Sequence, residues 1–144
     1  MPLTPATAED IAEVSRQLGR EARDIVAIAS RCVCGKPTVV HTAPRLADGT
    51  PFPTTYYLTH KVATAAVSTL EASGLMAELQ QRLADEPELA AAYQKAHESF
   101  IADRDKTAKD LGLDVPEIAG ISAGGMPTRV KCLHALIGHS LAAG

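Results

Sequence analysis

The sequence predicts an α+β fold in which a small, antiparallel, three-stranded sheet packs against four to five helices. Short stretches rich in β-branched residues, bounded by turn residues, occupy much of the N-terminal half of the chain. Apolar residues with helical spacing dominate the rest of the chain. A length of 144 residues is common for one domain, so we expect a single globular domain over residues 1–144.

The first helix is expected to begin after Thr7. Thr7 and Asp10 have the spacing of a capping box, with aspartate in place of the usual glutamate. Apolar residues then recur on one face of the helix, at Ile11, Val14 and Leu18. Gly19 predicts the end of this helix, because glycine readily adopts the backbone conformation that terminates one.

Three segments are expected to form the sheet. The apolar run from Asp24 to Cys32 predicts the first strand, and the β-branched segment Pro37–Thr42 predicts the second, with a turn over residues 34–37 between them. The stretch Pro44–Pro53 contains three prolines and an Asp-Gly pair, which predicts a loop. Thr54–Thr59 follows as the third strand.

Four further helices are expected after the sheet, at Val62–Ser73, Leu75–Leu83, Pro87–Leu111 and Pro127–Ala142. Their apolar stripes are typical of faces that pack in a core. We interpret His97, which stands in a charged run, as a solvated surface residue unless it packs back against the sheet. In the last helix, His134 lies on the apolar face and is interpreted as a hydrogen-bonded core residue.

Composition excludes several classes of protein. The chain is 46% hydrophobic with a formal charge of -3 and no tryptophan, which argues against general nucleic-acid binding and against stacking on bases. A signal peptide and an apolar run long enough to span a membrane are both missing, so we expect a cytoplasmic protein with no membrane partner. Three cysteines, an odd number, then indicate reduced thiols or metal ligands.

The three cysteines lie in two short clusters at opposite ends of the chain. One is Arg31-Cys32-Val33-Cys34-Gly35, and the other is Arg129-Val130-Lys131-Cys132-Leu133-His134 with His139. If the fold brings these clusters together, they form a thiolate and imidazole site flanked by arginine, able to bind a metal, perform nucleophilic chemistry or sense redox state. If it does not, the cysteines are small core residues.

The first hypothesis is a metal site. Cys32 and Cys34 stand two residues apart, so their sulfurs would share one face of a strand. Cys132 is a candidate third ligand, and His60, or else His41 on the neighbouring strand, could complete the set. We therefore expect Cys32, Cys34, His60 and Cys132 to hold zinc or an iron-sulfur cluster.

The second hypothesis is a cysteine-dependent enzyme acting on a small phosphate- or carboxylate-bearing substrate. Cys132 and His139 are nearly eclipsed, two turns apart on the predicted last helix, and form the candidate catalytic pair. His41 is an alternative partner for Cys132, and Cys34 an alternative nucleophile. A third possibility is a non-catalytic assembly partner, whose apolar docking surface the sequence does not reveal.

A small anion is an alternative candidate ligand beside the cysteines. The candidate cations that would bind it are Arg31, Arg45, Arg129 and Lys131. The glycine-rich stretch Gly120–Pro127 precedes the predicted last helix and would place Arg129 in its first turn. The helix dipole makes a cation unfavourable at that position, and a bound anion would compensate for this. In the alternative interpretation, Arg129 pairs with Asp24 or Asp48.

Three segments resemble one known family. They are Arg31-Cys32-Val33-Cys34-Gly35-Lys36-Pro37, the run Pro44–Thr54 with Tyr57-Leu58-Thr59, and Arg129-Val130-Lys131-Cys132-Leu133-His134. Together they are similar to motifs of the bacterial Domain of Unknown Function 501 family. The resemblance implies a compact bacterial cytoplasmic protein without an established activity. Relatives often carry Cys-Pro where this chain has His60-Lys61, an exchange that suits a metal ligand.

Overall fold

The computed structural model describes residues 3–123 and 126–144. Within these residues, five α-helices and one 3₁₀ turn accompany a four-stranded antiparallel sheet with the strand order β1-β2-β3-β4. The elements are β1 (Thr4–Pro5), α1 (Ala8–Leu18), β2 (Ile25–Arg31), β3 (Pro37–Thr42), β4 (Tyr56–Leu58), α2 (Lys61–Ala72), α3 (Leu75–Asp85), α4 (Pro87–Leu111), η1 (Pro116–Ile118) and α5 (Leu133–Ala143). The α+β class is confirmed.

The sheet has one strand more than the sequence predicts. Strand β1 pairs with β2 through Thr4 opposite Ile28 and Pro5 opposite Ala27. Two residues are too few to show an alternating pattern, and a proline argues against a strand unless it lies at a sheet edge, as it does here. The strand predicted from Asp24 to Cys32 ends at Arg31 in the structure, so Cys32 and Cys34 lie beyond it and are not held by strand geometry.

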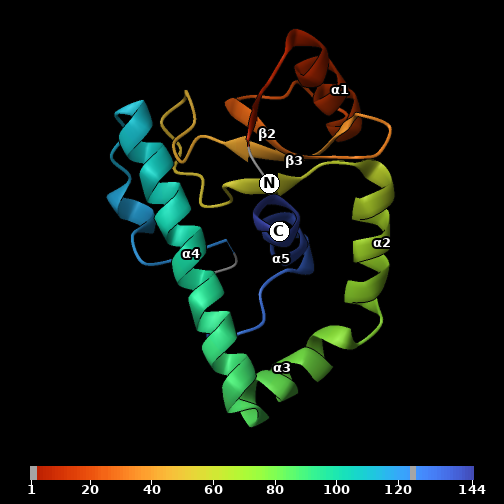
Figure 1. The fold of residues 1–144 in the computed structure, drawn as a ribbon, viewed down its shortest axis with the longest axis vertical. Helices are drawn as coiled ribbons and strands as arrows, with labels where there is room; N and C mark the ends of the chain where they lie inside the picture. Colours follow the sequence, from red (N-terminus) through yellow and green to blue (C-terminus); the bar gives the residue numbers. More distant parts are fainter. Residues whose placement is uncertain (1–2, 124–125) are drawn as a thin grey trace.

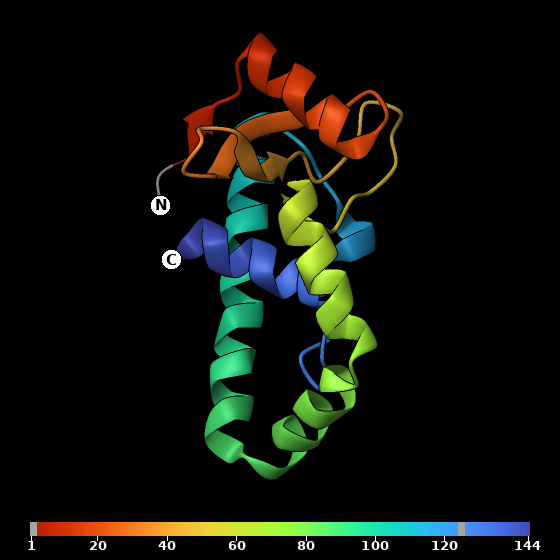
Figure 2. The ribbon, with the colours of Figure 1, turned by 90° about the vertical axis from the view of Figure 1, so that its right-hand side faces the viewer.

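Helix α1 covers one face of the sheet (Figure 2). Its capping box is confirmed: the Asp10 amide donates to Thr7 Oγ1, and the Thr7 amide donates to Asp10 Oδ2, each at 3.1 Å. Val14 of α1 packs against Ile28 and Val40 of the sheet. This small apolar layer holds α1 in place.

The larger core lies on the opposite face of the sheet, around α5. Figure 1 shows α2, α3 and α4 as a U-shaped frame with α5 inside it, and Figure 2 shows α5 crossing between α2 and α4 below the sheet. Val39 and Leu58 of the sheet share this core with Phe100 of α4 and Leu133 of α5. Helix α5 is therefore central to the fold.

Helix α5 approaches β4 so closely that it needs a glycine. A Cβ built on Gly138 would lie 3.0 Å from the Tyr56 carbonyl oxygen and 3.7 Å from the Leu58 amide nitrogen. Although alanine is intrinsically the better helix former, we expect Gly138→Ala to lower the free energy of unfolding by about 1–3 kcal/mol, because the backbone of β4 would have to move. Urea unfolding checks this, with the exposed Ser140→Ala as the control. A stabilised Gly138→Ala protein would contradict the close contact.

The last helix begins at Leu133 and not at Pro127, so its predicted start is wrong. Side chains of α3 and α4 bind the preceding backbone: Gln80 Oε1 accepts from the Val130 amide at 2.8 Å, and the Tyr93 hydroxyl accepts from the Lys131 amide at 2.7 Å. These amides are thereby satisfied outside a helix. Arg129 and Lys131 precede α5 instead of lying in its first turn.

His97 is buried, with 6% of its surface exposed, so its interpretation as a solvated residue is wrong. Its Nδ1 lies 3.0 Å from Ser122 Oγ, and burial lowers its pKa. Arg104 lies about two turns further along α4 and is also buried. It donates to the carbonyl oxygens of Ile118 and Ile121 at 2.8 and 2.6 Å. The two side chains fix the segment that follows η1.

Candidate functional site: two cysteine and histidine clusters

The first cluster forms at the tip of the β2–β3 hairpin. Ligand atoms of Cys32, Cys34 and His60, here called the hairpin cluster, all lie within 4.8 Å of one another. The turn is closed by the Cys32 amide, which donates to the Lys36 carbonyl at 2.9 Å, and by the Gly35 amide, which donates to the Cys32 carbonyl at 2.8 Å. Gly35 has a φ of 88°, a conformation that favours glycine. The turn directs both cysteines to one side.

His60 reaches this turn because β4 runs antiparallel to β3. The end of β4 therefore lies beside the start of β3, where the Thr59 amide donates to the Thr38 carbonyl at 3.0 Å. His60 follows at once as the N-cap of α2, with extended backbone and without a side-chain capping bond. Its ring is therefore not used to cap the helix.

The surroundings of the hairpin cluster favour thiolate. The backbone of Lys36 hydrogen bonds to Cys34 and, together with the Cys32 side chain and the Lys36 charge, lowers the pKa of the Cys34 thiol. Deprotonated sulfur is the form that binds a metal. Cys34 is exposed and Cys32 is partly buried, so an ion could reach the cluster from solvent.

The second cluster lies where α2 approaches the start of α5. It consists of Glu71, Cys132 and His134, here called the helix cluster. The distance from Cys132 Sγ to His134 Nδ1 is 3.6 Å, and that to Glu71 Oε1 is 3.5 Å. His134 Nδ1 and Glu71 Oε1 are 2.5 Å apart. One sulfur, one nitrogen and one oxygen that could bind a metal therefore lie within 3.6 Å of one another.

The outer contacts of the helix cluster orient the imidazole of His134. His134 Nε2 lies 3.3 Å from both the Thr64 carbonyl oxygen and Ser68 Oγ. Partial burial alone would raise the pKa of Glu71, but the hydrogen bonds of His134 and Cys132 outweigh it and lower that pKa. Glu71 is therefore a carboxylate at neutral pH.

The structure separates residues that the sequence places in one site. It brings together Cys32, Cys34 and His60, three of the four expected metal ligands, whereas Cys132 belongs to the helix cluster. Along α2, residues 60 and 71 are separated by a rise of about 16 Å. The two clusters are accordingly distinct, and the expectation that they meet is wrong.

The two histidines considered as partners of Cys132 lie in the core. His139 stacks on Tyr56 with ring centroids 5.6 Å apart and meets Phe100 edge to face at 5.3 Å. His41 is buried, with its Nε2 2.7 Å from Thr107 Oγ1. The histidine that contacts Cys132 is His134, so its interpretation as a core residue is wrong. A weak sequence signal for this pair is the short spacing of Cys132 and His134, which are two residues apart.

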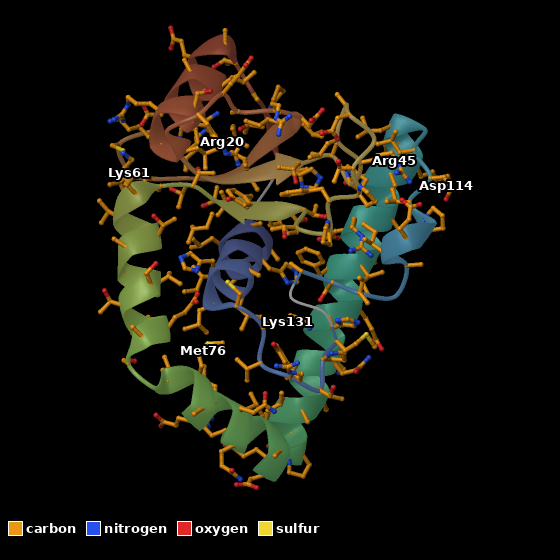
Figure 3. All side chains as sticks on the ribbon, turned by 180° about the vertical axis from the view of Figure 1, so that it is seen from behind. Arg20, Arg45, Lys61, Met76, Asp114 and Lys131 are labelled. Carbon is orange, nitrogen blue, oxygen red and sulfur yellow. The ribbon has the colours of Figure 1, made fainter. Side chains whose placement is uncertain are left out.

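The four candidate anion-binding residues are dispersed. Arg31 donates to both carboxylate oxygens of Asp10 at 2.8 Å, and Arg45 pairs with Glu117 at 2.6 Å. Lys131 is buried with its Nζ 5.3 Å from the centroid of the Tyr93 ring, and Figure 3 shows it inside the helical frame, away from Arg45. A shared anion pocket is not formed by these described side chains.

Arg129 is exposed in the turn before α5. The aspartates considered as its partners bind backbone elsewhere: Asp24 Oδ1 accepts from the Ala47 amide at 3.2 Å, and Asp48 Oδ1 accepts from the Thr50 amide at 2.9 Å. Of the glycine-rich stretch Gly120–Pro127, residues 124 and 125 lie outside the described residues.

A groove of about 460 Å³ connects β4 with the helix cluster. Its lining includes Tyr57 and Thr59 of the β4 segment, Thr64 of α2, and Cys132 and His134. Volumes of this size accommodate small molecules.

Among the described helices, none combines the length and apolar character needed to cross a membrane.

Comparisons with known proteins identify a family without identifying an activity. No curated protein and no solved structure matches the chain. A family model described as "Protein of unknown function (DUF501)" matches residues 28–144, which include every member of both clusters. Because this match covers most of the sequence, the chain belongs to the DUF501 family.

Proposed function

We propose that this protein binds a transition-metal ion through Cys32, Cys34 and His60, with zinc as the preferred ion. The observation that supports the proposal is the convergence of two thiols and one imidazole from two separate segments. Sulfur and nitrogen ligands suit zinc, and in four-coordinate sites they lie about 3.3–3.8 Å from one another. Small rotations of these exposed or partly buried side chains would reach that spacing.

An iron-sulfur cluster is less well supported than zinc. Such clusters are held by four protein ligands in most cases, and the hairpin cluster supplies three. The three cysteines are free of disulfides, so their thiols are available as metal ligands. A bound ion would join the β2–β3 hairpin to the start of α2.

Metal analysis of protein purified without an affinity tag and reconstituted with zinc tests this function. We expect the Cys34→Ser and His60→Ala variants each to bind one equivalent less than the unaltered chain, because each loses a ligand. Val33→Ser is the matched control, since Val33 is fully exposed in the same turn and carries no ligand. Less than a tenth of an equivalent lost in both variants would contradict the proposal.

A further inference from the structure

The helix cluster has the ligand spacing of a metal site. In four-coordinate zinc sites, neighbouring ligand atoms are about 3.3–3.8 Å apart. The separations of Cys132 Sγ from His134 Nδ1 and from Glu71 Oε1, 3.6 and 3.5 Å, fall within this range. The Nδ1–Oε1 distance of 2.5 Å is that of a hydrogen bond and would open by about 1 Å when an ion replaces the shared proton.

The contacts of the His134 ring favour metal binding over proton relay. In a cysteine–histidine–acid relay, the thiol and the carboxylate contact different ring nitrogens. Here both contact Nδ1, while Nε2 lies against the Thr64 carbonyl. A carbonyl oxygen only accepts, so Nε2 is a donor to Thr64, and Nδ1 is the ring nitrogen that faces Cys132 and Glu71. An ion bound there would replace the proton that Nδ1 shares with the Glu71 carboxylate. Metal-binding histidines are held in this way by an outer carbonyl or carboxylate.

The helices favour a cation between them. Glu71 lies in the last turn of α2, where the helix dipole makes a carboxylate unfavourable unless a cation compensates it. Cys132 is the N-cap of α5, where the dipole favours thiolate. A divalent ion bound to both groups would neutralise the two negative charges.

The groove beside β4 leaves room for a further ligand. Cys132 and His134 both line this groove of about 460 Å³. Zinc sites with three protein ligands and an accessible fourth position take water or a substrate there, unlike closed structural sites. We infer that Glu71, Cys132 and His134 form a second divalent-metal site, independent of the hairpin cluster, whose fourth position opens into this groove and accepts a small oxygen-donor ligand.

The two sites would bind separate ions. Two-metal centres hold their ions about 3.5–4 Å apart, whereas residues 60 and 71 are separated by a rise of about 16 Å along α2. Loss of the hairpin cluster should therefore leave the second site intact. The inference about this second site therefore does not depend on the proposal for Cys32, Cys34 and His60.

Cobalt titration of the Cys32→Ser/Cys34→Ser protein isolates the second site, because Cys132 is then the remaining cysteine of the chain. We expect one equivalent of Co²⁺ to produce a thiolate-to-cobalt charge-transfer band. Adding Glu71→Gln should weaken binding at least tenfold, whereas Glu78→Gln, which alters an exposed acid of α3, should not. Acetate should shift the cobalt d–d bands by entering the fourth position.

Three results would overturn the inference. They are a missing charge-transfer band, equal affinity in the Glu71→Gln and Glu78→Gln proteins, and d–d bands that do not respond to acetate. If circular dichroism shows that the double serine variant is unfolded, Glu71→Gln is made in the otherwise unaltered chain. Its zinc content should then fall by one equivalent, and an unchanged content would equally overturn the inference.

Discussion

Zinc should raise the thermal unfolding midpoint of this protein by about 8–16 °C when the free ion exceeds its dissociation constant a thousandfold. An ion that binds the folded chain alone stabilises it by about 4 kcal/mol under that condition. In a domain of this size, 1 kcal/mol corresponds to about 2–4 °C. His60→Ala should lose the part of this shift that arises at the hairpin cluster, and Val33→Ser should keep it. Differential scanning calorimetry with and without zinc measures the effect.

The zinc-dependent shift should diminish as the pH falls. Zinc competes with protons for sulfur and imidazole nitrogen, so its affinity decreases where these groups are protonated. The backbone hydrogen bond at Lys36 lowers the pKa of Cys34, which extends the thiolate form toward lower pH. A shift of equal size in acid and at neutral pH, or an equal shift in His60→Ala, would contradict binding at this cluster.

Arg104→Met should lower the free energy of unfolding by about 2–4 kcal/mol, because it removes two hydrogen bonds from a charged donor to the carbonyl oxygens of Ile118 and Ile121. Arg104 is 2% exposed, and its guanidinium binds the carbonyls of Ile118 and Ile121. Burial lowers the pKa of Arg104, and the Asp105 charge opposes that shift. The side chain thus acts as a charged donor inside the fold.

Urea unfolding of Arg104→Met and of the control Arg82→Met measures this contribution. Arg82 is exposed and pairs with Glu86 on the helix surface, so its replacement should change stability by less than about 1 kcal/mol. Equal destabilisation by the two substitutions would contradict the role of Arg104 in holding the segment after η1.

Features set by neighbouring residues could be predicted from the sequence. The Thr7–Asp10 capping box depends on four consecutive residues, and the structure has it. The start of α5 could not be predicted, because Gln80 and Tyr93, far away in the chain, bind the amides that would otherwise begin the helix. Local periodicity does not reveal such long-range hydrogen bonds.

In the candidate sites too, local features could be predicted from the sequence and long-range contacts could not. His60 could be placed near Cys32 and Cys34, since antiparallel strands return the chain to the hairpin turn. The grouping of Cys132 with Glu71 could not, because it depends on how α2 and α5 pack. Glu71 belongs to no sequence motif that would mark it as a ligand. Metal binding by either cluster stays a prediction.

Anomalous diffraction at the zinc absorption edge, from crystals of the zinc-reconstituted protein, tests the central claim most directly. We predict a peak bonded to the sulfurs of Cys32 and Cys34 and to a ring nitrogen of His60, at about 2.0–2.3 Å from each. A map in which these three side chains are ordered and no zinc peak lies between them would contradict it.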